Sequence, residues 1–90
     1  MKGKLSNGFK FEVDTEVFND MELIEAIVAS EGDEPTRIVE VVERILGKEQ
    51  KKALYDSLRN EDGKVTVEAV GEAIDEIMAK VSEDSEGKNS

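Results

Sequence analysis

The sequence predicts a mostly helical α+β domain, in which an N-terminal β-hairpin is followed by about four short helices in a compact bundle and a disordered C-terminal tail. Two observations lead to this prediction. Over most of the chain, apolar residues recur at three- and four-residue spacings, as they do on the buried stripe of a helix. Before them, an Asn-Gly pair precedes strictly alternating apolar and charged residues, as in a half-buried hairpin. A chain of 90 residues allows one small domain, which we place at residues 1–81.

The hairpin is expected over residues 2–13. Asn7-Gly8 indicates a two-residue turn, because both residue types tolerate a positive φ. Apolar and charged residues alternate after the turn, so one face of the hairpin is apolar. The residues of this face are Phe9, Phe11 and Val13, with Leu5 as the cross-strand partner. Because an isolated hairpin is marginal in water, we expect this one to pack on the helices.

The first helix is expected over about residues 20–30. Asn19 as the N-cap and Glu22 three residues later form a capping box at its start. The apolar residues of the segment recur at helical spacing and should form its buried face. They are Leu23, Ile24, Ile27 and Val28.

The second helix is expected over about residues 35–46, with Pro35 in its first turn and Gly47 as its stop. Its many β-branched residues make a strand the competing local assignment. The apolar residues cover roughly 160° of a helical wheel, which is wider than one-sided burial needs. Two explanations are therefore open: a central helix contacted on two sides, which we favour, or a face partly exposed to a partner.

Two further helices are expected over about residues 48–59 and 67–81, joined by a polar turn at residues 60–63. The inward residues of the earlier helix are Leu54, Tyr55 and Leu58. The stripe of the later helix consists of Val67, Val70, Ile74, Ile77, Met78 and Val81. Gly71, isolated within that helix, indicates close packing with a neighbour. Residues 82–90 contain no apolar residue, so an acidic, disordered tail is expected.

The composition argues against catalysis and against metal ligation. The chain has no Cys and no His, which removes disulfides, thiolate metal sites and the commonest catalytic base. The turn at residues 60–63 is similar to the middle of an EF-hand loop, but Leu58 and Ala69 would occupy the first and twelfth positions, where Ca²⁺ needs carboxylates. No nucleophile–base spacing or phosphate-binding glycine loop occurs. We therefore predict no enzyme activity and no catalytic, cofactor or metal site.

The net charge of −10 argues against binding to nucleic acid or to anionic lipid. No apolar run approaches the length of a membrane span or of a signal-peptide core. A cytoplasmic protein without a membrane partner is therefore expected.

Three blocks of the sequence resemble tail assembly chaperones of long-tailed bacteriophages, of the siphophage type. They are residues 46–65 (LGKEQKKALYDSLRNEDGKV), residues 2–14 (KGKLSNGFKFEVD) and residues 87–90 (GKNS). The resemblance implies a non-enzymatic protein of the host bacterial cytoplasm that binds the long helical tape-measure protein. It would keep this client soluble while the tail-tube protein polymerises, and it would be absent from the mature virion. The tail-tube protein as a second partner and self-association both stay open.

A client helix would need an apolar groove, and the wide face of the second expected helix is our candidate for it. Its residues are Ile38, Val39, Val42 and Leu46. The resemblance also implies a programmed minus-one ribosomal frameshift near the end of the gene. Gly87-Lys88-Asn89 can be encoded GGA AAA AAC, which contains a slippery heptamer, so these residues are the candidate frameshift position.

The alternative function is that of a small acidic regulator which binds a basic partner, as nucleic-acid mimics do. The net charge of −10 favours it, whereas the interleaving of acidic residues with Lys and Arg argues against it. High salt should abolish binding by such a mimic and spare apolar binding.

Overall fold

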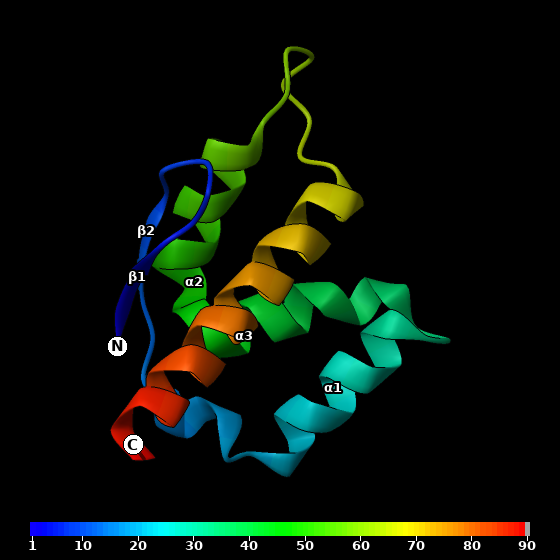
Figure 1. Cartoon of the computed structure of the whole chain (residues 1–90). Helices are drawn as coiled ribbons and strands as arrows, with labels where there is room; N and C mark the ends of the chain where they lie inside the picture. Colours follow the sequence, from blue (N-terminus) through cyan, green and yellow to red (C-terminus); the bar gives the residue numbers. More distant parts are fainter. Residues whose placement is uncertain (90) are drawn as a thin grey trace.

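The computed structural model describes the backbone of residues 1–89 and the side chains of residues 1–84, while Ser90 lies outside the described residues. A short antiparallel hairpin precedes a helical body, as the sequence predicts (Figure 1). The elements are β1 (Lys2–Lys4), β2 (Lys10–Glu12), the 3₁₀ helix η1 (Thr15–Phe18), α1 (Met21–Glu31), the 3₁₀ helix η2 (Pro35–Arg37), α2 (Ile38–Leu58) and α3 (Val67–Asn89).

Helix α2 is the centre of the fold, and it bends sharply at Gly47. The φ and ψ angles of Gly47 are 81° and 167°, a combination that is essentially restricted to glycine. The bend divides α2 into a first arm, residues 38–46, and a second arm, residues 48–58 (Figure 1). The predicted break at Gly47 is therefore confirmed. The expected helix over residues 35–46 begins later than predicted, because residues 35–37 form the separate 3₁₀ helix η2.

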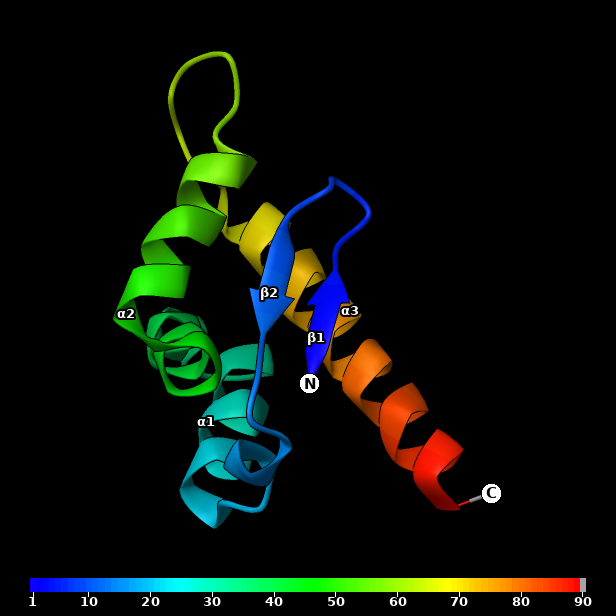
Figure 2. The same cartoon turned by 90° about the vertical axis from the view of Figure 1, so that its left-hand side faces the viewer.

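The first arm of α2 lies between α1 and α3, and the second arm lies beneath the hairpin (Figures 1 and 2). Residues from the hairpin and from all three α-helices form one hydrophobic core. Its largest fully buried side chains are Leu23, Leu54, Ile77, Val13, Val41 and Val42. The favoured explanation of the wide apolar face is thus confirmed, because α2 is contacted on more than one side.

The hairpin has an inner and an outer face, as its alternation predicts. Phe11 is buried opposite Gly3 in the strand register, and Leu5 packs in the same core. The turn differs from the expected two-residue turn. Leu5 N donates to Phe9 O at 2.8 Å and Gly8 N donates to Leu5 O at 2.9 Å, so the loop has three residues. Only Gly8 needs a positive φ, of 94°, which is the usual way to close a three-residue loop.

Polar side chains tie the hairpin turn to both neighbouring helices. The carboxylate of Glu76 on α3 accepts from Ser6 N at 2.6 Å and from Ser6 Oγ at 3.0 Å. Asn7 Nδ2 donates to Ser57 Oγ on the second arm of α2 at 3.4 Å. The hairpin is therefore fixed to the helices by hydrogen bonds as well as by its apolar face.

Helix α1 differs from its prediction at its start and on its outer face. Its N-cap is Asp20, one residue after the expected Asn19, and the Asp20 carboxylate accepts from Glu22 N at 2.9 Å. Only Leu23 and Ala26 are buried, whereas Ile24 and Val28 are exposed. The elements that pack on α1 cover Leu23 and Ala26, and the apolar side chains of Ile24 and Val28 stay partly in contact with solvent.

Helix α3 is longer than expected and continues through Asn89, not ending at Val81. Residues 82–89 include no proline and no β-branched residue, and extending an existing helix costs little once it is nucleated. The disordered tail expected over residues 82–90 is thus replaced by helix up to Asn89. Val67, expected on the buried stripe of α3, is instead exposed at the start of the helix.

Candidate functional site

The four residues of the candidate client-binding face do not share an open surface. Val42 is fully buried and Leu46 is 6% exposed. Ile38 is half-buried against the core, and only Val39, at 48%, is well exposed. The candidate face is therefore corrected: its centre packs inside the protein, because α2 is the central helix and its wide apolar arc serves burial.

A groove lies instead between α1 and α3, and the first arm of α2 forms its floor (Figure 1). We call it the α1–α3 groove. Its volume is about 230 Å³. Its apolar residues are Ile27 from α1, Ile38 and Val41 from α2, and Val67, Ile74 and Met78 from α3. Three helices thus contribute to one apolar concave surface, which is the usual character of a site for a ligand or a partner helix.

Gly71 keeps the α1–α3 groove open. It lies on the wall formed by α3. No described atom would lie within 4 Å of a Cβ at this position, so Gly71 does not mark the close helix packing that the sequence indicates. The missing side chain leaves room in the groove. On the opposite wall, the hydroxyl of Ser30 donates to Ile27 O at 2.8 Å, so its hydrogen is already used within α1.

An exposed apolar stripe on α1 lies beside the groove. Met21, Ile24 and Val28 are 70%, 40% and 64% exposed, and their spacings of three and four residues place them on one side of the helix. Ile27, which lines the groove, is three residues after Ile24 and therefore neighbours it on the surface of the helix. We refer to Met21, Ile24 and Val28 as the α1 stripe. Exposed apolar residues that adjoin a groove are typical of an interaction surface.

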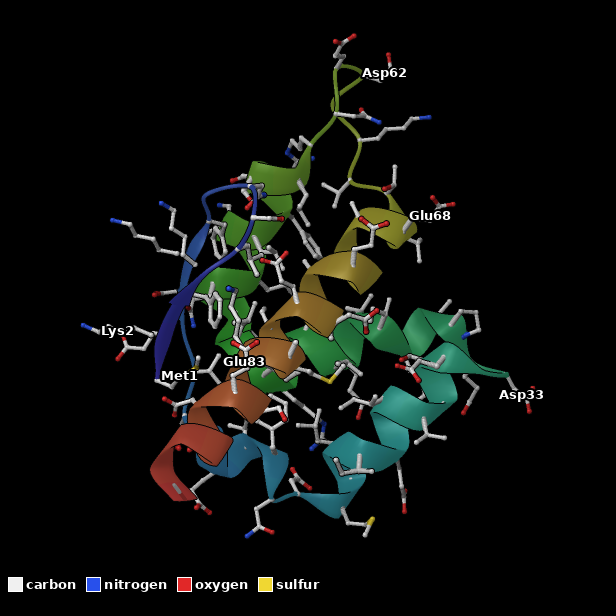
Figure 3. All side chains as sticks on the ribbon, viewed as in Figure 1. Met1, Lys2, Asp33, Asp62, Glu68 and Glu83 are labelled. Carbon is white, nitrogen blue, oxygen red and sulfur yellow. The ribbon has the colours of Figure 1, made fainter. Side chains whose placement is uncertain are left out.

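The charged residues of the groove are all acidic. Among the described residues that line it, Glu31 on α1 and Asp75 on α3 are the only charged ones, and both are exposed. Figure 3 shows Asp33 and Glu68 projecting from the same side of the molecule, whereas Lys2 projects from the opposite side. The described lining of the groove is therefore acidic around an apolar centre.

Two cations of α2, Arg44 and Lys51, form close ion pairs with neighbouring carboxylates. Lys51 Nζ lies 2.8 Å from Glu43 Oε2, and this hydrogen bond lowers the pKa of Glu43 below its ordinary value and raises that of Lys51. Arg44 pairs with Glu40 at 2.9 Å and with Asp20 at 3.3 Å. Arg44 and Lys51 are thus held by carboxylates of the same molecule, and such exposed pairs add little stability.

A second charged surface, which the sequence analysis missed, covers the outer face of the hairpin. Lys2, Lys4 and Lys10 are all exposed there, and Lys4 is directly opposite Lys10 in the register. The sequence did contain a signal for this surface. Successive side chains of a strand point to opposite faces, so the lysines next to Phe11 in the pattern lie on the face away from it. Like charges in opposite positions do not stabilise a strand pair.

The described residues contain no group of three or more Asp or Glu side chains placed to hold a metal ion. No polar or charged residue in that part of the chain is buried. None of the helices described combines the length and the apolar character that a membrane span requires. The α1–α3 groove with the adjoining α1 stripe combines a concave apolar lining with exposed apolar residues, so it is our candidate site for binding another molecule.

The candidate frameshift position, Gly87, Lys88 and Asn89, falls in the last turn of α3, where only the backbone is described.

Comparisons of the chain with protein-family models, with curated proteins and with solved structures find no match.

Proposed function

We propose that the protein is a non-enzymatic tail assembly chaperone of a long-tailed bacteriophage. In this role it binds the tape-measure protein in the host cytoplasm, keeps it soluble during tail-tube assembly and is absent from the mature virion. The resemblance of residues 2–14, 46–65 and 87–90 to that family suggests the role. The α1–α3 groove is the structural observation that supports it.

The groove suits the client that this role requires. A tape-measure protein is a long helix, and a helix that presents an apolar stripe binds by laying this stripe into an apolar groove. The α1–α3 groove offers side chains from three helices, and the α1 stripe extends the apolar surface beyond it. Transfer of these side chains from water to the client would supply the driving force.

The net charge of −10 suits the part of the proposed role in which the bound client is kept soluble. Several copies bound along one client would surround it with negative charge. Like-charged complexes repel one another and stay dispersed. The same charge gives the bound client a solvated surface in place of its own apolar stripe.

Co-expression tests the proposal. The chain is produced in bacteria together with the tape-measure protein from the same phage genome, and the soluble fraction of the tape-measure protein is measured. The unmodified chain should keep the client soluble. Gly71→Leu, which fills the groove, should lose this effect, whereas the matched control Gly71→Ala should retain it. Circular dichroism checks that both variants fold.

Two results would overturn the proposal. One is a client that is equally insoluble with and without the unmodified chain. The other is binding that disappears at high salt, because this would favour the acidic regulator of a basic partner over an apolar chaperone.

Silent recoding of the Lys88 and Asn89 codons adds a genetic test, since it should abolish a minor, longer product of the native gene.

A further inference from the structure

We infer that the α1–α3 groove selects a helix whose apolar stripe is flanked by Lys or Arg on both sides. This inference rests on the proposed function and names the chemistry of the client segment. It follows from the charges at the two walls of the groove and from the absence of cations among the described residues that line it.

The two walls carry one carboxylate each. Glu31 projects from the end of α1 and Asp75 from the middle of α3, and both are exposed. Neither makes an ion pair within the described part of the chain. Both carboxylates are therefore free to meet charges on an incoming molecule.

The cations near the floor of the groove are already committed. Arg37 precedes Ile38 in the chain, and its guanidinium lies 3.2 Å from Glu40 Oε1 and 3.7 Å from Glu34 Oε2. Its hydrogen bond to Glu40 raises the pKa of Arg37 and lowers that of Glu40. Arg37 is thus paired with carboxylates that do not line the groove, and it forms no ion pair with Glu31 or Asp75 within the described part of the chain. Figure 3 shows Asp33 and Glu68 projecting from the same side of the molecule.

The geometry of a bound helix connects these charges to a sequence pattern. When the apolar stripe of a helix faces the floor, the residues on its two flanks point toward the two walls. Cationic flanks would then meet Glu31 and Asp75, whereas acidic flanks would be repelled. Exposed ion pairs contribute little to affinity but discriminate well between partners.

A pair of designed peptides tests this selectivity. Each is a labelled amphipathic helix with one leucine stripe, flanked by Lys in the first peptide and by Glu in the second. Fluorescence anisotropy measures their binding to the full chain. The Lys peptide should bind about tenfold more tightly at low salt. Salt should narrow this difference without abolishing binding of the Lys peptide, because the apolar contact persists.

Two double variants separate the groove from the overall charge. Glu31→Lys/Asp75→Lys should reverse the preference and favour the Glu peptide. The matched control, Glu49→Lys/Glu72→Lys, carries the same net charge. Glu72 lies on α3 but lines the surface beneath the hairpin turn, and Glu49 is an exposed residue that does not line the groove. The control should keep the preference for the Lys peptide.

Three results would overturn the inference: equal binding of the two peptides, an equal loss of preference in both double variants, or a dimer of the chain that Gly71→Leu dissociates. The last result would assign the groove to a second copy. If the chain keeps the tape-measure protein soluble but shows no preference, only the inference fails. If it prefers the Lys peptide but does not solubilise the tape-measure protein, the proposed function fails.

Discussion

The side-chain amide of Gln50 pairs with the backbone of Glu12 in the way a neighbouring strand would. Glu12 N donates to Gln50 Oε1 at 2.8 Å, and Gln50 Nε2 donates to Glu12 O at 2.7 Å. The same Nε2 donates to Leu46 O at 2.9 Å, beside the bend of α2. One side chain therefore satisfies the backbone groups of Glu12 at the free edge of β2 and binds a carbonyl beside the bend, which joins the sheet to the central helix.

Replacement of Gln50 by Ala should destabilise the protein by about 1–2 kcal/mol, because the backbone groups of Glu12 lose their partner. Urea denaturation followed by circular dichroism measures this change. Lys52→Ala, at an exposed position on the same arm of α2, is the control and should change stability by less than about 0.5 kcal/mol. Equal effects of the two substitutions would show that the amide does not matter.

Gly47→Ala should destabilise the protein by about 1–3 kcal/mol, because alanine cannot adopt the backbone angles of the bend without strain. No described atom lies within 4 Å of the position of the new Cβ, so the cost is conformational and not a clash. Thermal unfolding measures it.

Gly71→Ala is the matched control for the bend, because its Cβ would also lie in open space but its backbone is helical. This substitution should stabilise the protein by about 0.5–1 kcal/mol. Effects of the same sign at Gly47 and Gly71 would contradict the assignment of strain to the bend.

Gly3→Ala should destabilise the hairpin by about 1–3 kcal/mol through overpacking. A Cβ at residue 3 would lie 2.5 Å from Cζ of Phe11, and Phe11 is buried, so its ring has little freedom to move. A double-mutant cycle with Phe11→Leu measures the coupling, since the smaller side chain should relieve part of the cost. Additive effects would show that the ring and the glycine do not constrain each other.

Acid should remove a stabilising contribution that depends on Glu43. The hydrogen bond from Lys51, opposed by partial desolvation and supported by the charges of Lys51 and Lys48, lowers the pKa of Glu43 from its ordinary value of 4.5. The contribution is therefore fully present above the pKa of the unfolded state and is lost as the pH falls through the lower pKa of the folded state.

The stability of Glu43→Gln should consequently fall less steeply with acidification than that of the unmodified chain. Urea denaturation at a series of pH values below neutrality measures the slopes. Glu49→Gln, an exposed carboxylate for which the described structure shows no ion pair, removes the same charge and serves as the control. Identical slopes for the two variants would rule out a specific role for the Glu43–Lys51 pair.

Local signals predicted much of the fold. The alternation of residues 9–13 and the glycine at residue 47 are encoded within a few neighbouring residues, and the hairpin and the bend of α2 appear where they were expected. The loop of the hairpin was predicted one residue too short, because an Asn-Gly pair fits both a two-residue turn and the end of a three-residue loop.

The candidate site could not be predicted in the same way. Periodicity indicated a buried face on α1 and a wide apolar arc on α2, but it does not show which of these apolar residues meet a neighbour. Val42 is covered by the rest of the core, whereas Val28 is left exposed. That difference arises from the placement of α1 and α3 on either side of the first arm of α2, which depends on contacts between distant segments. The role of Gly71 was equally undecided by the sequence, since an isolated glycine in a helix can allow a neighbouring helix to pack closely or can leave space in the wall of a groove.

The bend at Gly47 also separates two kinds of constraint on a single helix. Residues before it, such as Ile38 and Val41, shape the groove, while Gln50 and Ser57 after it hold the hairpin in place. Substitutions that reshape the groove can therefore accumulate in the first arm without disturbing the contacts of the second. A domain built in this way can exchange one binding partner for another over evolutionary time and still keep the same scaffold.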